Sequence, residues 1–339
     1  MRALAITAQG DPVAPNTVFT DMPDIEPGPG DVRVHTEASA FNHLDLWVGR
    51  GLPGIETNYP HISGSDGCGI VDAVGENVDD AWLGKRVVVN AAVEQPQSGK
   101  PAGRNIVMLG EHTNGTHAES FCAPATNVLN IGDTDPMQAA AFGLSHLTAW
   151  RMMVTKGQLQ RGDFVLITGI GGGTALAALG IARHFECTTI VTSRHQWKLD
   201  RAIELGVDHA VLDEGGDFSR AVRAATGKRG VDVCIDSIGG PVHHACIKSL
   251  ARSGRLVLCG CTAGANPPTD LARLFWNQQS ILGSTMGDMQ EMASSMALLM
   301  GGDVTPVIDQ VYAPGDGGQA VSRLEAGEQF GKLVLDWRE

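Results

Sequence analysis

The residues most suggestive of chemistry form a glycine-rich run, Gly169-Ile170-Gly171-Gly172-Gly173-Thr174-Ala175. It follows an apolar segment and precedes a segment of helical periodicity, so we expect a turn from a strand into a helix. Glycine allows the backbone to approach a pyrophosphate, which helix N-terminal N–H groups then bind. The fit to G-x-G-x-x-G is imperfect, and a tight turn alone is the alternative. We predict dinucleotide binding at Gly169, Gly171, Gly172, Gly173, Thr174 and Ala175.

The end of the next predicted strand indicates which dinucleotide is bound. An NAD site usually has an acidic residue there, on the ribose 2′-hydroxyl. This chain has Ser193 and Arg194 instead, with Lys198 one helical turn further on. Hydroxyl, guanidinium and ammonium groups suit a 2′-phosphate, so we predict NADP(H) rather than NAD(H). The alternative is a solvated basic start to a helix.

Cysteine usage argues against both a disulfide framework and a cysteine-rich metal site. The count is odd, the spacings are scattered, and most thiols lie in apolar runs. We expect no metal. The seven positions are Cys68, Cys122, Cys187, Cys234, Cys246, Cys259 and Cys261.

The elements that would position these groups differ along the chain. Residues 163–261 alternate short apolar runs with amphipathic helical segments, which indicates a parallel sheet covered on both faces. Residues 1–128 hold β-like runs between Gly/Pro turns, typical of a compact barrel-type domain. We interpret 91–118 as a surface lobe or loop, and 139–154 as a long apolar helix. We expect domains at 1–128 and 129–265, with 266–339 completing the sheet and returning to the first domain.

Composition limits the class of protein. The chain has 339 residues, 43% of them hydrophobic, and a net charge of −13. This excludes a disordered chain and makes non-specific binding to nucleic acid or anionic lipid unfavourable. We find no apolar run long enough for a membrane helix and no signal peptide. We therefore expect a cytoplasmic protein with a small-molecule substrate.

Several segments together resemble the medium-chain dehydrogenase/reductase superfamily, and more closely its zinc-independent quinone oxidoreductase-like branch. They span nearly the whole chain in the family's order. The resemblance implies an α/β fold class: a Rossmann doubly wound parallel sheet plus a GroES-like β-barrel catalytic domain. The segments are EPGPGDVRVHTEASAFNHLDLWVGRG, YPHISGSDGCGIVDAVGENV, AAAFGLSHLTAWRMM, VLITGIGGGTALAALGIAR, CIDSIGG and FGKLVL.

The chain departs from zinc-dependent members of that superfamily wherever they carry ligands. Asn42 stands where they have a catalytic Cys, and Gly64-Ser65-Asp66 replaces their G-H-E. The helix at 139–150 and the lobe at 91–118 contain no Cys. A makeshift site from Asp66 with His43 or His61 is the alternative.

The resemblance also implies roles for individual residues. Asn42 and Asp45 would lie in the active cleft as catalytic candidates, where Asn42 would offer hydrogen bonds to substrate or nicotinamide ribose, while Asp45 has a structural alternative, orienting a neighbour. His43 would contact the cofactor pyrophosphate. Thr148 would lie beside the nicotinamide, as would the strand end at Gly260, Cys261 and Thr262. Lys332, which matches a family Gly-Lys, would be a further cofactor-binding residue. The alternatives are helix capping for Asn42, a backbone hydrogen bond for Thr148, and a capping or solubilising role for Lys332.

Two further positions concern the proton donor and the adenine contact. Tyr59, which precedes the Gly64-Ser65-Asp66 segment, is a candidate proton donor, with barrel packing as its alternative. Relatives often have an aromatic residue near 212 that can stack on adenine. This chain reads Val211-Leu212-Asp213, so we do not expect that contact.

Without zinc, hydrogen-bond donors or water must stabilise charge on the substrate oxygen. We therefore expect an NADPH-dependent oxidoreductase acting on acceptors with delocalised charge, such as quinones and α,β-unsaturated carbonyls. The alternatives are a zinc-dependent alcohol dehydrogenase and a non-catalytic NADPH-binding protein. The resemblance implies a homodimer formed through the sheet edge at 279–284.

Overall fold

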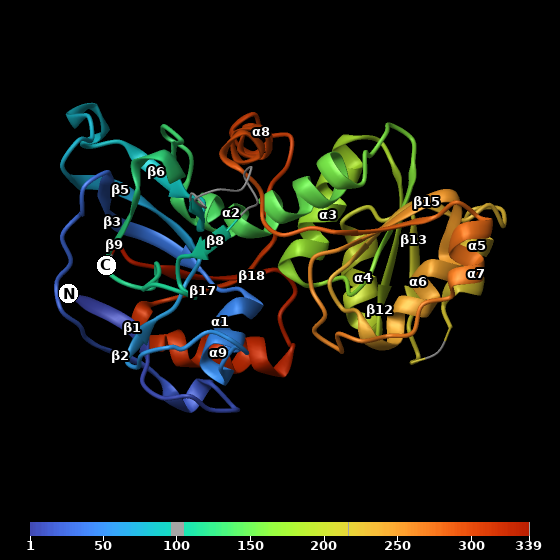
Figure 1. Cartoon of the computed structure of the whole chain (residues 1–339), viewed down its shortest axis with the longest axis horizontal. Helices are drawn as coiled ribbons and strands as arrows, with labels where there is room; N and C mark the ends of the chain where they lie inside the picture. Colours follow the sequence, from blue (N-terminus) through green and yellow to red (C-terminus); the bar gives the residue numbers. More distant parts are fainter. Residues whose placement is uncertain (96–104, 216, 339) are drawn as a thin grey trace. The chain divides into compact units, whose positions relative to one another are not determined.

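The computed structural model describes residues 1–95, 105–215 and 217–338. The chain forms two compact units (Figure 1). Unit 1 comprises Met1–Leu144 and Asp288–Glu339, and unit 2 comprises Ser145–Gly287. The predicted domain boundaries at 128/129 and 265/266 differ from the divisions at 144/145 and 287/288 between these units. The three-part domain division stays a prediction.

Unit 2 is built on a six-stranded parallel sheet. The strand order is β13-β12-β11-β14-β15-β16, the 3-2-1-4-5-6 order of a dinucleotide-binding doubly wound fold. The predicted Rossmann sheet is thus confirmed. The strands are β11 (Phe164–Ile167), β12 (Thr188–Ser193), β13 (His209–Leu212), β14 (Val231–Asp236), β15 (Leu250–Leu258) and β16 (Ser280–Gly283).

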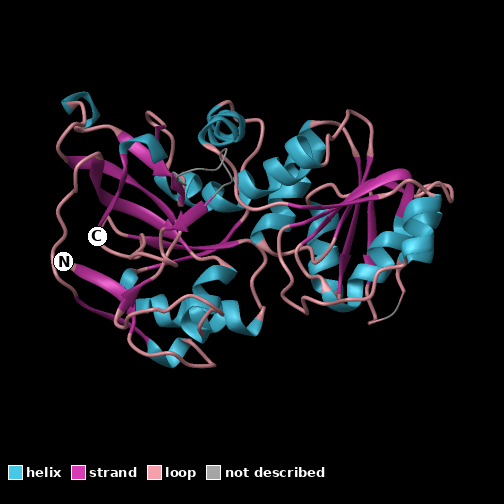
Figure 2. Ribbon diagram, viewed as in Figure 1, coloured by secondary structure: helices cyan, strands magenta, loops and turns pink. Residues whose placement is uncertain are grey.

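Helices cover both faces of this sheet (Figure 2). In the first helix after the glycine run, Ala177 and Ala178 are fully buried, because small side chains allow a helix to approach the strands closely. Leu166, Cys234 and Cys246 belong to the apolar cluster that packs strands against helices. The helices are α3 (Gly173–His184), α4 (Gln196–Glu204), α5 (Ser219–Ala225), α6 (His243–Ser249) and α7 (Leu271–Trp276).

Unit 1 is mostly β-structure. Its largest sheet has the order β10-β6-β5-β3-β18-β17, with β9 also paired to β3. A smaller sheet has the order β2-β1-β4, and β7 pairs with β8. The strands are β1 (Arg2–Ile6), β2 (Thr17–Asp21), β3 (Asp31–Ala40), β4 (His61–Ile62), β5 (Asp66–Val74), β6 (Arg86–Val89), β7 (Ala92–Gln95), β8 (Asn105–Met108), β9 (Ser120–Pro124), β10 (Val128–Asn130), β17 (Ile308–Tyr312) and β18 (Lys332–Asp336).

The C-terminal strand β18 lies between β3 and β17, so the end of the chain completes the sheet of unit 1. Leu46, Val321 and Leu335 share one apolar core that joins two helices to this strand. The helices of unit 1 are α1 (His43–Arg50), α8 (Met289–Met300) and α9 (Gly317–Ala326), and α2 (Pro136–Trp150) runs across the division between the units.

Two segments differ from the sequence-based expectation. The lobe expected at 91–118 contains the antiparallel pair β7–β8 among its described residues, while 96–104 lie outside them. The helix expected at 139–154 ends as α2 at Trp150 and continues as a π-helical segment, Arg151–Lys156. Among the described helices, none combines the length and apolar character needed to cross a bilayer.

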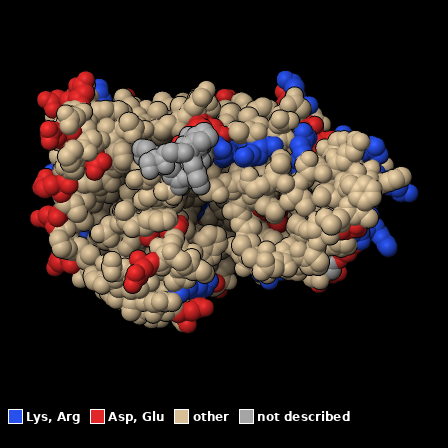
Figure 3. Space-filling view, viewed as in Figure 1, with Lys and Arg blue, Asp and Glu red and all other residues tan. Residues whose placement is uncertain are grey.

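The two units differ in charge. Unit 1 has 10 Lys and Arg against 27 Asp and Glu, a net charge of −17. Unit 2 has 15 Lys and Arg against 11 Asp and Glu, a net charge of +4. Acidic side chains gather over unit 1 and basic ones over unit 2 on the face in Figure 3. A positive unit attracts an anionic ligand such as a dinucleotide.

Candidate functional site

The glycine run forms the turn from β11 into α3 of unit 2. Gly169 and Gly171 have φ values of 66° and 111°, which side chains rarely adopt. Gly172 is the N-cap of α3, and no side chain caps this helix end. The first N–H groups of α3 are therefore not bonded by a capping side chain, and together with the helix dipole they favour an anion. The predicted residues Gly173, Thr174 and Ala175 begin α3.

A buried carboxylate shapes the neighbouring loop at the end of β14. Asp236 is fully buried and accepts hydrogen bonds from the Thr168 hydroxyl at 2.6 Å and from the N–H groups of Ile238 and Gly239 at 2.9 and 3.1 Å. The predicted residue Thr262 donates its hydroxyl to the Ser237 carbonyl at 3.3 Å. The loops after β14 and β15 therefore hold each other at the carboxyl edge of the sheet, where such folds bind ligands.

Of the residues predicted to bind a 2′-phosphate, Ser193 ends β12, Arg194 follows it and Lys198 lies in α4. The buried hydroxyl of Ser193 accepts from the His195 N–H at 3.1 Å and so shapes the start of α4. Arg194 is exposed. Lys198 is largely buried, with its ammonium 5.1 Å from the centre of the Trp197 ring.

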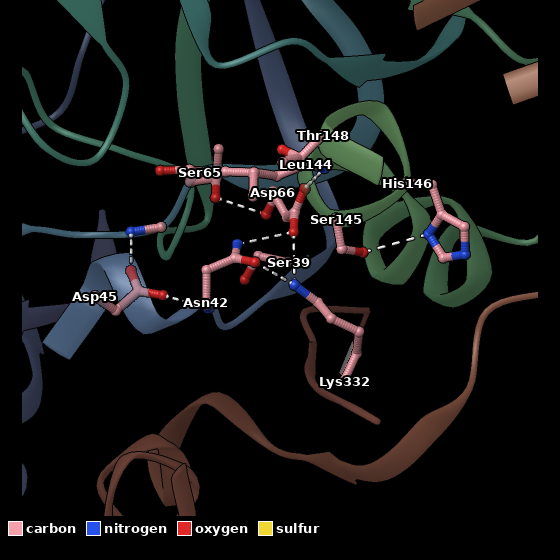
Figure 4. Close-up of polar contacts among 12 residues, drawn as sticks. Ser39, Asn42, Asp45, Ser65, Asp66, Leu144, Ser145, His146, Thr148 and Lys332 are labelled. Carbon is pink, nitrogen blue, oxygen red and sulfur yellow. Dashed lines mark hydrogen bonds and ion pairs between the residues drawn. The ribbon is translucent and has the colours of Figure 1, made fainter. Parts of the chain in front are cut away.

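In unit 1, three polar side chains meet in the interior (Figure 4). Asp66 on β5 is fully buried and Lys332 on β18 is 4% exposed. The Lys332 ammonium lies 2.8 Å from Asp66 Oδ2 and 2.6 Å from Asn42 Oδ1. The Asn42 amide closes the triangle by donating to Asp66 Oδ2 at 2.9 Å. We call Asn42, Asp66 and Lys332 the ammonium centre.

The backbone of α2 completes the coordination of Asp66. The Leu144 N–H donates to Asp66 Oδ1 at 2.5 Å. The residue before it must be glycine, because a Cβ on Gly143 would lie 2.2 Å from the same oxygen. The Thr116 hydroxyl donates to the Asp66 carbonyl at 2.7 Å. Both carboxylate oxygens thus have donors, as a buried charge requires.

A second buried carboxylate fixes the start of α1. Asp45 accepts from the N–H groups of Asn42 and Gly64 at 2.7 and 2.8 Å. Burial raises its pKa, but His117 and these two donors outweigh that effect, so the pKa of Asp45 is below its usual value. Asp45 therefore orients the backbone of Asn42, which is the N-cap of α1 and forms a capping box with Asp45. The Asn42 amide also bonds in the ammonium centre.

The histidine beside Asp45 belongs to a chain of buried polar groups. The indole N–H of Trp337 donates to Ser39 Oγ at 2.9 Å, and Ser39 Oγ lies 2.8 Å from His117 Nδ1. His117 Nε2 lies 3.7 Å from Asp45 Oδ1, too long for a hydrogen bond. A serine that accepts from tryptophan donates most simply to Nδ1, which places a ring N–H of His117 on Nε2, the nitrogen nearer Asp45.

The remaining predicted residues lie in varied surroundings. His43 is the exposed first residue of α1. The Tyr59 hydroxyl donates to the Val48 carbonyl at 3.0 Å, and its ring packs against an apolar core, which agrees with the packing alternative. In unit 2, the Thr148 hydroxyl faces the Met286 sulfur at 3.8 Å. Gly260 and the exposed Cys261 follow β15.

The donor set around Asp66 does not match what zinc requires. Zinc takes three or four nitrogen, sulfur or oxygen ligands in tetrahedral geometry. Across residues 1–95, 105–215 and 217–338, no group of three or more His, Cys, Asp or Glu could hold a metal ion. Asn42 and Asp66 instead share the ammonium of Lys332. We derive no chemistry through a metal at this centre.

The sequence analysis missed part of this arrangement. It predicted Lys332 as a cofactor-binding residue and Asp66 as a possible zinc ligand, without bringing the two together. It did not single out Ser39, His117 or Gly143. Asp66 and Lys332 are separated by 266 positions in the sequence, so no local pattern connects them. The only signal was the charged residue at the start of the otherwise apolar segment KLVL.

Two family models match this chain. The model described as "Alcohol dehydrogenase GroES-like domain" matches residues 28–133, and "Zinc-binding dehydrogenase" matches residues 173–300. Among curated proteins, the 2-haloacrylate reductase of Burkholderia sp is 28% identical over 78% of this chain and 75% of its own length.

Solved structures agree over nearly the full length. The crystal structure of an NAD-dependent alcohol dehydrogenase superposes with a TM-score of 0.90 and 35% identity, covering 99% of both chains. A mycobacterial quinone oxidoreductase superposes with a TM-score of 0.82 and 27% identity, again covering 99% of both chains.

Proposed function

Because the chain belongs to the medium-chain dehydrogenase/reductase superfamily, whose members bind a nicotinamide dinucleotide, we propose that it is an NADPH-dependent reductase of quinones or α,β-unsaturated carbonyls that works without zinc. One observation carries this proposal. Asn42 stands where the zinc-dependent members have a catalytic Cys, and Gly64-Ser65-Asp66 replaces their G-H-E. Both Asn42 and Asp66 bond to the Lys332 ammonium. The relatives named 2-haloacrylate reductase and quinone oxidoreductase support reduction of an activated acceptor.

The choice of NADPH rests on the end of β12. Ser193, Arg194 and Lys198 supply a hydroxyl and two cations there, and no carboxylate stands at the strand end to bind a ribose 2′-hydroxyl. The net charge of +4 on unit 2 adds a general attraction for a polyanion.

Different groups of the chain bind the cofactor and arrange the ammonium centre in this proposal. When bound, the nicotinamide cofactor supplies the hydride. The N–H groups at the start of α3 bind its phosphates, and Arg194 pairs with the 2′-phosphate. Asp45 holds Asn42 in place, and Asn42 and Asp66 hold the Lys332 ammonium. No metal is available in this scheme to bind an alkoxide, so acceptors with delocalised negative charge react fastest.

The second candidate function is alcohol oxidation with NAD. The solved NAD-dependent alcohol dehydrogenase at 35% identity favours it. It requires a strongly polarising group for a simple carbonyl, and the residues at the expected ligand positions supply no thiolate.

Steady-state turnover tests the two candidates directly. The purified chain is assayed for NADPH and NADH oxidation with a panel of quinones, enals and enones, and for NAD⁺ reduction with primary and secondary alcohols. Metal content is measured on the same sample. We expect NADPH-dependent reduction that survives chelation, with less than about 0.1 zinc per chain. One tightly bound zinc lost together with alcohol oxidation would overturn the proposal.

We also propose a homodimer through the edge of the unit 2 sheet. β16 is an edge strand, and an unpaired edge is a template for a second chain. The helix α7 just before it has three strongly exposed apolar side chains, Leu271, Phe275 and Trp276. Sedimentation of the wild type and of Phe275→Glu/Trp276→Glu should give a dimer and a monomer respectively. A wild-type monomer at micromolar concentration contradicts this assignment.

A further inference from the structure

His117 of unit 1 is fixed through both its ring and its backbone. The side chain is fully buried, and its ring centre lies 4.4 Å from that of Phe41. Ser39 Oγ lies 2.8 Å from Nδ1 and is itself bonded by the Trp337 indole at 2.9 Å. The His117 backbone N–H donates to the Ser63 carbonyl at 3.1 Å. The ring therefore cannot turn without breaking a buried contact, which is costly.

The fixed ring directs its remaining N–H at Asp45. Nε2 has no hydrogen-bond partner among the described residues and lies 3.7 Å from Asp45 Oδ1. The two side chains are buried, because His117 is 0% exposed and Asp45 is 3% exposed. In such a low-dielectric interior, the attraction between an N–H dipole and a carboxylate acts beyond hydrogen-bond length. A movement of the carboxylate by about 0.8 Å would give an ordinary N–H···O distance.

The position of Asp45 determines that of Asn42 (Figure 4). Asp45 Oδ2 accepts from the Asn42 N–H at 2.7 Å, and Oδ1 accepts from the Gly64 N–H at 2.8 Å. The Asn42 side chain in turn bonds to Lys332 at 2.6 Å and to Asp66 at 2.9 Å. A displaced Asp45 would therefore move the backbone from which the Asn42 amide reaches its two charged partners.

We infer that His117 is a positioning residue that acts through Asp45 to hold the Asn42 amide in the ammonium centre. The inference rests on the proposed function, because Asn42 and Lys332 are its predicted catalytic and cofactor-binding residues. All the contacts that carry it lie within unit 1. His117 touches neither substrate nor cofactor in this scheme, so its substitution changes the reaction only through Asn42.

The alternative is that the His117 ring only fills space beside Phe41. Three substitutions separate the two roles. The side-chain amide nitrogen reaches the place of Nε2 in His117→Gln but only that of Nδ1 in His117→Asn, while His117→Phe keeps an aromatic ring without either nitrogen. A positioning role predicts that only His117→Gln preserves the interaction with Asp45. A packing role predicts that His117→Phe is the mildest change of the three.

Hydrogen exchange measured by NMR on the full chain reports the position of Asp45 without turnover. The two amides to follow are the N–H groups of Asn42 and Gly64, which donate to its carboxylate. Their protection is compared with that of the β3 amides, so that a general loss of stability cancels. It should fall about tenfold in His117→Asn and His117→Phe, and less than about twofold in His117→Gln.

The matched control is His35→Asn, the same substitution at an exposed position of unit 1. It should change neither the exchange of the two amides nor turnover. If His117→Asn does not fold, Ser39→Ala tests the same point, because it removes the hydroxyl that keeps the ring N–H on Nε2 and leaves the ring in place. Ser39→Ala should lower the protection of the Asn42 N–H about threefold.

Turnover of an enal with NADPH gives the functional readout. The value of kcat/KM should fall at least about tenfold in His117→Asn and stay within about threefold of wild type in His117→Gln. An active wild type whose His117→Gln and His117→Asn variants have equal kcat/KM overturns the positioning role and leaves the proposed function standing. A wild type that reduces no quinone, enal or enone overturns the proposed function, while the exchange of the Asn42 N–H still decides whether His117 holds that residue. Equal protection in His117→Gln and His117→Asn, or His117→Phe as the mildest change, overturns the inference and assigns the ring to packing.

Discussion

Unit 1 keeps full charges in its interior, where Asp66 and Lys332 pair at 2.8 Å, whereas the loop Gly169–Gly173 of unit 2 offers only the partial charges of backbone N–H groups. The first arrangement needs three side chains from three elements and a glycine beside them. The second needs only a strand, a turn without side chains and a helix. A site built from buried side chains is therefore disrupted when any one partner is removed. A site built from backbone N–H groups depends mainly on whether side chains leave room for the ligand.

The largest effect should come from breaking the ammonium centre. Asp66→Asn leaves a buried ammonium uncompensated, which costs about 3–5 kcal/mol of unfolding free energy. The matched control is Asp72→Asn, which removes a partner of Arg33 at 2.9 Å on the surface and should cost less than about 1 kcal/mol. Urea denaturation measures both. Equal losses of unfolding free energy in the two variants would contradict a larger contribution from the buried pair. The double variant Asp66→Asn/Lys332→Met should recover most of the loss seen in Asp66→Asn.

The next effect concerns side-chain recognition in unit 2. Arg194→Ala removes a charge-assisted hydrogen bond worth about 1.5–3 kcal/mol, so the Kd for NADPH should rise about 10–150-fold. The Kd for NADH should change less than about threefold. Arg220→Ala removes the same charge from α5 and serves as the control. Fluorescence titration gives each Kd, and equal weakening of NADH and NADPH would reject the 2′-phosphate contact.

Two glycine substitutions set the units directly against each other. Gly143→Ala forces a Cβ to 2.2 Å from Asp66 Oδ1 and should cost about 1–3 kcal/mol of stability. Gly172→Ala meets nothing nearer than the Gly169 carbonyl at 3.9 Å, so only the weaker N-cap preference of Ala lowers stability, by less than about 1 kcal/mol. Its methyl group would instead occupy the face that binds phosphate and weaken NADPH about tenfold, or about 1.4 kcal/mol. A large melting-temperature loss in Gly172→Ala would contradict this division.

The smallest effect is a difference in pH dependence. The lowered pKa of Asp45 in unit 1 means that its contribution to stability is present above its ordinary pKa, ~3.9, and is lost as pH falls through the lower folded value. Burial instead raises the pKa of Asp163 in unit 2, so its charged form costs stability as pH rises through the folded value. Asp45→Asn should therefore remove a rise of unfolding free energy with pH below about pH 4, whereas Asp163→Asn should remove a fall with pH above about pH 4. Slopes that change in the same direction would overturn the assignment.

Much of unit 2 was predictable because its signals are local. The alternation of apolar runs and amphipathic helices over 163–261 gave the strand and helix order, and the glycine run fell between β11 and α3 as expected. Unit 1 was predictable only as a β-rich domain. The β7–β8 pair was missed, since the polar composition of 91–118 resembles a loop.

The sequence alone determined the class of fold, the glycine turn between β11 and α3 and the absence of thiolates at the positions of zinc ligands, because each depends on residue type and short-range periodicity. Only the tertiary structure decided that Lys332 would meet Asn42, which is 290 residues away. That meeting requires β18 to pair with β3 and β5 to lie on the other side of β3. A charge is stable in an interior only when other elements bring its partners, so no stretch of sequence could reveal the ammonium centre.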